Sequence, residues 1–194
     1  MINAEWLKQF CDGQIRDLDQ PHVFIHPDTD EQFSYATDGH RMVIVCGVIE
    51  GCTPSQEPNI KGFLLDPCGV EVETAALQAF LGCGKPTTRP CGKCDLGVVT
   101  CNCPSCETSP HTYKCSCGGK PVLLVNHGLL GIAPINRALL ADAIADVTDK
   151  TVLVYVAGTD VAVHIFTSDR HVVVMPIRSI DTAYASRFEI GVLA

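Results

Sequence analysis

The 194-residue sequence lacks the features that would place it in a membrane or a secretory compartment. No apolar run approaches the roughly 18 residues that span a bilayer, because the best stretch, 122–135, is interrupted by Asn126 and His127. The first ten residues have neither the basic nor the apolar region of a signal peptide. We therefore expect a protein without a membrane partner that is made and kept in the reducing cytoplasm.

Enzyme signatures are scarce as well. The sequence has no glycine-rich phosphate loop and no Ser/His/Asp arrangement at a known spacing. Pro90-Cys91-Gly92-Lys93-Cys94 matches half of the zinc site of nucleobase deaminases, a reaction that also needs an upstream His-x-Glu or Cys-x-Glu. No histidine supplies the first form, and the spacing from Cys68 to Glu71 does not fit the second. We predict that the protein is not an enzyme.

Cysteine, by contrast, is abundant and clustered. Seven of the twelve cysteines and one histidine lie within 90–117, whereas the rest of the chain has enough apolar residues to build its own core. Cys91 and Cys94 are separated by two residues, as are Cys103 and Cys106, and this spacing is typical of zinc-binding turns. The remaining candidate donors make a second set of four: Cys101, His111, Cys115 and Cys117.

These eight donors predict one or two structural Zn²⁺ ions per chain. Which cysteines share an ion stays open, because Cys115 and Cys117 also fit the first site. A segment of about 37 residues with few large apolar side chains does not fold by burial alone, so metal would supply the missing free energy. Disulfides and an iron–sulfur cluster are the alternatives. Outside the cluster, Cys11 and Cys46 are expected to be small core residues.

Charge is unevenly distributed along the chain. Residues 83–120 carry five Lys/Arg against two Asp/Glu, a net charge of +3, which leaves −11 for the remainder of a chain whose total is −8. The basic residues of this segment are Lys85, Arg89, Lys93, Lys114 and Lys120. We predict that they contact DNA phosphates and that Tyr113 stacks on a base. The alternative is that the charges only keep a small segment soluble.

Hydrophobic periodicity divides most of the chain into two similar blocks. Each block has an amphipathic helix, predicted over 3–18 and 134–149, followed by three strands. The expected strands are 22–26, 32–37 and 40–48 in the first block and 151–157, 160–166 and 170–177 in the second. Asn136 is predicted to cap the second helix. Asp38 and Asp169 open the last strands at an offset of 131 residues, which indicates an internal repeat and an α+β fold with two helices on one face of an antiparallel sheet.

This periodicity predicts four segments along the chain. They are a first repeat over 1–48, an insertion over 49–120 that includes a zinc-binding segment over 83–120, a second repeat over 121–178, and a C-terminal tail over 179–194. Within the insertion we expect a short strand over 63–66 and a short helix from Thr74 to Gly82. The stretch 122–132 is expected to be a strand that leads into the second helix.

Two short stretches, each on the last strand of a predicted repeat, carry a family resemblance. They are Ala36-Thr37-Asp38-Gly39-His40-Arg41-Met42 and Val174-Met175-Pro176-Ile177-Arg178. The first resembles an Ala-Thr-Asp-Gly-His-Arg-Leu stretch, and the second a Val-Met-Pro-Met-Arg stretch, of the bacterial beta sliding clamp of the replicative DNA polymerase. The resemblance covers roughly 1–48 and 121–178. It implies a DNA-clamp-like domain of two helix-plus-strands repeats, one of the three such domains in a clamp chain.

The resemblance also implies a binding pocket and a function. In the family the two motif strands help form an apolar pocket that accepts short peptides from polymerases and other partners. By motif match, the pocket residues here would be Thr37, Gly39, His40, Arg41, Met42, Pro134, Leu139, Val174, Met175 and Pro176. We therefore expect a non-enzymatic clamp-like accessory factor of DNA replication or repair that assembles into a homo-oligomer. The alternative is a zinc-binding regulatory or interaction protein that has the clamp fold without encircling DNA.

Overall fold

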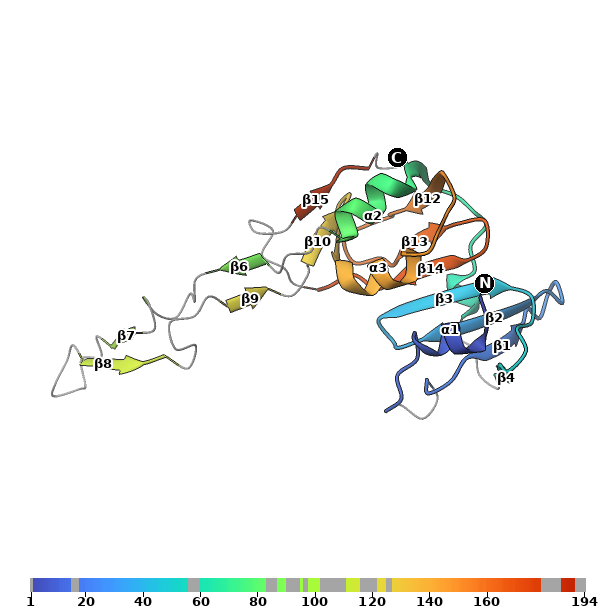
Figure 1. Cartoon of the computed structure of the whole chain (residues 1–194), viewed down its shortest axis with the longest axis horizontal. Coiled ribbons are helices and arrows are strands. Elements are labelled where there is room, and N and C mark those ends of the chain that lie inside the picture. Colours follow the sequence, from blue (N-terminus) through green and yellow to red (C-terminus); the bar gives the residue numbers. More distant parts are fainter. Residues whose placement is uncertain are drawn as a thin grey trace. The chain divides into compact units, whose positions relative to one another are not determined.

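The computed structural model describes residues 2–14, 18–55, 60–82, 87–89, 95, 98–101, 111–115, 122–124, 127–178 and 186–190. The chain forms two compact units (Figure 1). The larger unit contains residues 1–84 and 127–194, and the smaller unit contains residues 85–126. None of the helices within the described ranges is long and apolar enough to cross a membrane.

The larger unit is built on an eight-stranded sheet whose two halves have mirrored strand orders. In spatial order the strands are β4 (Thr53–Pro54), β1 (His22–Ile25), β2 (Gln32–Thr37), β3 (Arg41–Cys46), β14 (His171–Val174), β13 (Val163–Phe166), β12 (Thr151–Tyr155) and β5 (Val70–Glu73). Neighbouring strands are antiparallel except β1 and β4. The halves meet at β3 and β14, the central strand pair, where Met42 lies opposite Val173 and Ile44 opposite His171.

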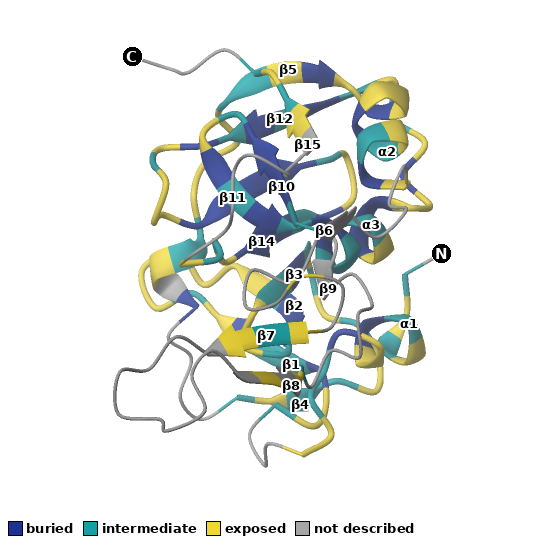
Figure 2. Ribbon diagram, turned by 90° about the vertical axis from the view of Figure 1, so that its left-hand side faces the viewer, coloured by how far each residue is buried: buried dark blue, intermediate teal, exposed yellow. Residues whose placement is uncertain are grey.

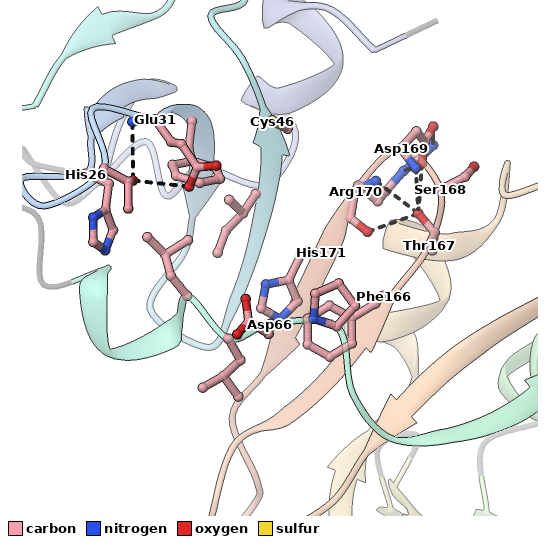
Figure 3. Close-up of a pocket in the computed structure, with 16 residues that line it drawn as sticks. His26, Glu31, Cys46, Asp66, Phe166, Thr167, Ser168, Asp169, Arg170 and His171 are labelled. Carbon is pink, nitrogen blue, oxygen red and sulfur yellow. Dashed lines mark hydrogen bonds and ion pairs between the residues drawn. The ribbon is translucent and has the colours of Figure 1, made fainter.

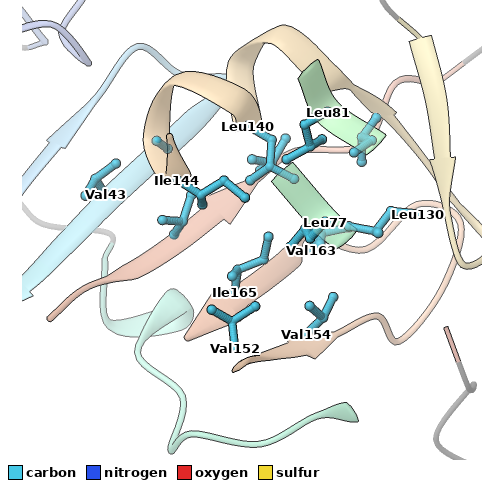
Figure 4. Close-up of a cluster of buried hydrophobic side chains, with 14 of the residues drawn as sticks. Val43, Leu77, Leu81, Leu130, Leu140, Ile144, Val152, Val154, Val163 and Ile165 are labelled. Atoms are coloured by element: carbon cyan, nitrogen blue, oxygen red, sulfur yellow. The ribbon is translucent and has the colours of Figure 1, made fainter. Parts of the chain in front are cut away.

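Helices cover one face of this sheet. They are α1 (Ala4–Lys8), α2 (Thr74–Gly82) and α3 (Arg137–Ile144). Leu7, Leu77 and Leu140 are completely buried with strand residues such as Val43 and Ile165 in one core cluster. Figure 4 shows this cluster between α2, α3 and the strands. Each fully buried leucine contributes about 1.5–3 kcal/mol.

The opposite face of the sheet carries a second, smaller cluster. Because side chains alternate along a strand, Val43 and Val172 point toward the helices while their neighbours Ile44 and Val173 point away from them. Ile44 and Val173 pack with the segment that contains the 3₁₀ turn η1 (Lys61–Phe63). The central strand pair is therefore buried on both faces.

A second sheet completes the larger unit. It contains β11 (Ala133–Asn136), β10 (His127–Leu130) and β15 (Ser186–Phe188), with β10 antiparallel to β11 and parallel to β15. Figure 2 shows buried residues along β10 and β11 as well as along β12 and β14. The last residue of β11, Asn136, accepts a hydrogen bond from the Ala138 N–H at 3.1 Å and so caps α3.

The described residues of the smaller unit form two antiparallel two-stranded ribbons. In one, β6 (Thr87–Arg89) pairs with β9 (Val122–Leu124). In the other, β7 (Val98–Cys101) pairs with β8 (His111–Lys114).

Several predicted elements are confirmed, and others are wrong at particular residues. The strand over 32–37 and the helix over 74–82 have the predicted bounds, and Asn136 is the predicted cap. The first helix ends at Lys8 rather than near residue 18, because the next N–H groups, of Phe10 and Cys11, donate to the carbonyl oxygens three residues before them, and the Asp12 N–H donates to the Leu18 carbonyl oxygen. The predicted strand over 63–66 is wrong, because its apolar residues pack onto the sheet without pairing with a strand.

The larger unit takes in residues 49–84, which the sequence analysis assigned to the insertion. The reason is that β5 pairs with β12 at one edge of the sheet and α2 packs beside α3. The Gln78 side-chain amide also donates to the carbonyl oxygen of Ile144 at 2.9 Å, which links α2 to the end of α3. The helix next to α3 is therefore α2, whose sequence belongs to neither predicted repeat.

Candidate functional site

The loop between β2 and β3 is fixed by hydrogen bonds to its own side chains. Asp38 Oδ1 accepts from the backbone N–H groups of His40 and Arg41, both at 2.9 Å. The Thr37 hydroxyl donates to the Arg41 carbonyl oxygen at 2.7 Å and accepts from the Gly39 N–H at 3.1 Å. Gly39 has a φ of +83°, a conformation that residues with a side chain rarely adopt. The Asp-Gly pair therefore positions the start of β3.

The central strand pair brings the two motif strands together. Arg41 lies opposite Val174, and Met42 lies opposite Val173. Beyond β14 the chain stays beside the loop, since the Met175 N–H donates to the His40 carbonyl oxygen at 2.8 Å. Two segments that are distant in the sequence thus form one surface.

A cavity of about 130 Å³ lies at this junction, and we call it the first cavity. Its lining residues come from the β2–β3 loop, β14 and η1: Thr37, Gly39, Arg41, Met42, Phe63, Val173 and Met175. Met175 is 40% exposed, which places a large apolar side chain at the surface. Methionine, phenylalanine and valine make the cavity mainly apolar, as in sites that bind small ligands or single side chains.

The remaining predicted pocket residues do not line the first cavity. Val174 is fully buried on the helix side of the sheet because side chains alternate along β14. Pro134 contacts the segment after β14 through its backbone, since its carbonyl oxygen accepts a hydrogen bond from the Ile177 N–H at 2.8 Å. His40 is exposed and Pro176 is half-buried.

The Arg41 guanidinium is bound to neighbouring groups rather than free for a ligand. Its Nε lies 3.0 Å from the Asp38 carboxylate. Its Nη1 donates to the Leu139 carbonyl oxygen at 2.9 Å and lies 3.2 Å from Asp142. The guanidinium carbon is 4.8 Å from the centre of the Phe10 ring. Leu139, also a predicted pocket residue, therefore meets the site through its carbonyl oxygen, and Arg41 joins the hairpin loop to α1 and α3.

Two lining residues were not found from the sequence. Val173 points into the first cavity because it alternates with the buried Val174, and the periodicity of β14 could have indicated this. Phe63 arrives from a 3₁₀ turn whose position on the sheet depends on tertiary packing. No local pattern of the sequence identifies it.

The candidate zinc ligands are only partly within the described residues. Cys91, Cys94, Cys103, Cys106 and Cys117 lie outside them. The strand register places Cys101 directly opposite His111 across β7 and β8, and Cys115 follows β8. The Cα atoms of opposite residues in an antiparallel pair lie about 5 Å apart, so this register is compatible with Cys101 and His111 binding the same ion. Within the described part of the chain, no three His, Cys, Asp or Glu side chains are close enough to hold a metal.

The predicted DNA-contacting residues also fall largely outside the described ranges. Lys85, Lys93 and Lys120 lie outside them. Arg89 is the last residue of β6, and Lys114 is exposed at the end of β8. These positions assign the two residues to different ribbons of the smaller unit.

The helices offer little positive charge at the surface. Arg137, the only basic residue of α3, is 1% exposed and donates to the Phe80 carbonyl oxygen at 3.1 Å. Its guanidinium carbon is 5.6 Å from the centre of the Phe80 ring. Along α1 and α3, the exposed charged residues are Glu5, Lys8 and Asp142. This balance does not favour contact with DNA phosphates.

Comparison with known proteins identifies the fold. No family model matches the sequence, and no curated protein is significantly similar to it. Among solved structures, the beta sliding clamp of Caulobacter crescentus matches with a TM-score of 0.53 and 11% identity, covering 91% of this chain and 61% of that one. The fold is that of a sliding clamp. The DnaN sliding clamp of Bartonella birtlesii gives a TM-score of 0.52 at 12% identity, with 90% and 62% covered.

The clamp fold accounts for nearly the whole chain but not for a whole clamp subunit. The DNA polymerase III beta subunit of Borrelia burgdorferi matches with a TM-score of 0.51 and 12% identity, over 89% of this chain and 58% of that one. This chain therefore spans about three fifths of the length of the clamp subunits it matches. The part of this chain that matches the clamps is longer than the two predicted repeats together, as expected if β5 and α2 also belong to the clamp fold.

Proposed function

We propose that this protein is a non-enzymatic accessory factor of DNA replication or repair whose first cavity binds a short apolar peptide of a partner such as a polymerase. The clamp fold supports the replication role. The observation that carries the binding role is the convergence of Met42 and Met175, from the two halves of the sheet, in one apolar cavity. Methionine side chains are flexible and polarisable, so they adapt to different bound side chains.

The peptide proposal is tested with Met175→Ala. A labelled peptide that binds bacterial sliding clamps is titrated with the full-length protein, and affinity is measured by fluorescence anisotropy. We expect the substitution to weaken binding about tenfold, as for a central apolar residue of an interface. Ile132→Ala is the matched control, because Ile132 is 41% exposed and does not line the cavity. Equal affinities for the two variants would contradict the proposal.

Zinc binding by the smaller unit is a second part of the proposal. It is supported by the paired Cys-x-x-Cys spacing and by the register of Cys101 with His111. Elemental analysis of protein purified from cytosol should find one or two zinc ions per chain. Cys91→Ser with Cys94→Ser should lower that number, whereas Cys68→Ser, outside the cluster, should not. Metal-free protein with disulfides among residues 91–117 would refute zinc binding.

A second candidate function is that of an interaction protein that uses the clamp fold without encircling DNA. The burial of Arg137 favours it, because a DNA-lining helix surface would present such a charge to solvent. Light scattering coupled to gel filtration distinguishes the two. A ring requires an oligomer, whereas a monomer at micromolar concentration supports the second function.

We assign the proposed DNA contact to the smaller unit. The support is its net charge of +3 between residues 83 and 120. Replacement of Lys93, Lys114 and Lys120 by glutamate should abolish binding to duplex DNA at low salt. The same replacement of Lys8, Lys150 and Arg187, which are exposed elsewhere, controls for net charge. For the unmodified protein, five contacts predict a slope of log K against log salt of at most about −4.5. Equal effects in both triple variants would count against this assignment.

A further inference from the structure

The central strand pair relates two loops by an approximate two-fold axis. A shift of 129 residues carries Arg41 to Arg170, Met42 to His171 and Ile44 to Val173, so the offset of 131 predicted from Asp38 and Asp169 is wrong by two residues. The pairing of Met42 with Val173 then becomes the pairing of His171 with Ile44, and both pairs are present in the register. The loops also share their hydrogen bonds, since the Thr167 hydroxyl donates to the Arg170 carbonyl oxygen at 3.0 Å, as Thr37 does to Arg41.

A larger cavity, of about 460 Å³, occupies the position that this axis assigns to a copy of the first cavity. Four lining residues of the first cavity have their equivalents at this shift: Arg170 for Arg41, His171 for Met42, Ile44 for Val173 and Cys46 for Met175. Thr167 matches Thr37 by its hydrogen bond and not by the shift, because the β13–β14 loop is one residue shorter than the β2–β3 loop. We call it the second cavity. Figure 3 shows residues of the β13–β14 loop and of the β1–β2 loop on its two sides.

The second cavity is more polar and more acidic than the first. Where the first cavity has methionines, the second has His171 and an exposed Cys46, which is not the core residue predicted from the sequence. Two exposed carboxylates, Glu31 and Asp66, also line it, and no described lining residue forms an ion pair with either of them. The one basic lining residue other than histidine, Arg170, is ion-paired with its own neighbours, as is Asp169.

Apolar and aromatic side chains form the rest of the second cavity. Phe33 and Phe166 line it, and Leu64 and Leu65 complete the wall from the segment after η1. Aromatic faces attract cations, and carboxylates beside an apolar surface favour a ligand that combines a positive charge with apolar contacts. An extended peptide with alternating basic and apolar side chains satisfies both requirements.

We propose that the second cavity is a binding site for a basic, apolar peptide segment of a partner protein, distinct from the peptide that enters the first cavity. This proposal rests on the proposed function in one respect: it assumes that peptide binding is the activity that both halves of the repeat share. The charge of the lining then sets the specificity: an apolar peptide for the first cavity and a basic one for the second.

The test uses the full-length protein and two labelled synthetic peptides, Gly-Arg-Leu-Phe-Arg-Gly and Gly-Glu-Leu-Phe-Glu-Gly. At low salt the basic peptide should bind at least tenfold more tightly than the acidic one. Glu31→Lys with Asp66→Lys should weaken binding of the basic peptide about tenfold or more, because each substitution replaces attraction by repulsion. Met175→Ala, in the first cavity, should leave this binding unchanged within twofold.

A charge-matched control separates local recognition from the general attraction of an acidic protein. Glu73→Lys with Asp160→Lys makes the same change in net charge at exposed positions outside the second cavity. An equal loss in this control, or no preference for the basic peptide, would overturn the proposal. If Met175→Ala abolished binding of the basic peptide, the proposal would also be overturned, because the peptide would then occupy the first cavity. Failure of the clamp-binding peptide in the first cavity would instead contradict the proposed function alone.

Discussion

Arg41 and Arg170, which follow equivalent turns in the two halves of the large sheet, bind at successive positions along α3 and the turn that follows it. Arg41 bonds to the Leu139 carbonyl oxygen and the Asp142 carboxylate, and Arg170 to those of Ala143 and Asp146. Ala143 comes four positions after Leu139, and Asp146 four positions after Asp142, a spacing of about one helical turn. The internal repeat therefore holds α3 at two points.

The two arginines differ in burial and in the number of bonds they make to their own turn. The Arg41 side chain is 10% exposed and the Arg170 side chain 2%. Arg170 binds both oxygens of Asp169, through Nε at 2.8 Å and Nη2 at 2.9 Å, and these bonds lower the pKa of Asp169. Its guanidinium carbon also lies 4.5 Å from the centre of the Trp6 ring. Arg170 is thus the more deeply buried of the two and is bonded more extensively to its own turn.

Replacing each arginine by methionine tests this difference and should give the largest effect. Methionine keeps much of the apolar stem but removes every hydrogen bond of the guanidinium. Arg170→Met should lower the free energy of unfolding by about 2–3 kcal/mol, because it leaves the buried carbonyl oxygen of Ala143 without a donor and removes the ion-pair partner of two half-exposed carboxylates. Arg41→Met should lower the free energy of unfolding by about 1–2 kcal/mol, because the ion pair of Arg41 with Asp142 is more exposed to solvent. Urea unfolding followed by circular dichroism measures both, and equal losses would remove the proposed asymmetry.

The pH dependence of stability should expose a second difference between the halves. Burial, together with the neighbouring His164, lowers the pKa of His171 to about 3. The folded state then binds fewer protons than the unfolded chain below pH 6.5, so the free energy of unfolding falls as the pH falls from that value toward 3. Between pH 7.5 and 5 the expected loss from this group is about 1–2 kcal/mol.

Methionine at position 171 would give the second half the residue that the first half has at position 42. Denaturant unfolding of His171→Met at pH 7.5, 6 and 5 should therefore show a shallower pH dependence than that of the unmodified protein. Part of the slope should remain, because burial also lowers the pKa values of His164 and His127. An unchanged slope would show that His171 is not the group responsible.

The helix caps provide the smallest test. Asn3 accepts from the Trp6 N–H at 2.8 Å at the start of α1, and Asn136 caps the longer α3. Asn136→Ala should cost about 1 kcal/mol, and Asn3→Ala about half of that, because α1 is only five residues long and its cap is exposed. Thermal unfolding of the two variants checks the order. A larger effect at Asn3 would mean that α1 contributes more to stability than its length indicates.

Prediction from the sequence succeeded where structure is local. The strand over 32–37, the α2 helix and the Asn136 cap follow from alternation, from stop signals and from the side-chain chemistry of asparagine. The first helix was predicted too long because its apolar spacing continues to residue 18, whereas the backbone hydrogen bonds leave the α-helical pattern after Lys8.

The candidate sites were predictable only in part. The two motifs supplied five residues that line the first cavity, but Phe63 reaches it through packing on the outer face of the sheet. The second cavity was not predicted at all. Its equivalence to the first appears only when the register of β3 with β14 is known, because the substitutions of Met42 by His171 and of Met175 by Cys46 leave no sequence similarity.

The sequence by itself determined the strand over 32–37, the cap at Asn136, the turn at Asp38-Gly39 and the concentration of positive charge and cysteine in one segment, because these depend on neighbouring residues and on composition. The stretch 122–132, predicted as one strand, is instead divided between β9 and β10 in two different sheets. Only the tertiary structure decided that β3 pairs with β14, that α2 lies beside α3, and that Arg41, Arg137 and Arg170 are bound internally rather than presented to a ligand. The reason is physical: a buried charge is stable only beside its partners, and the partners of Arg41 and Arg137 lie far from them along the chain.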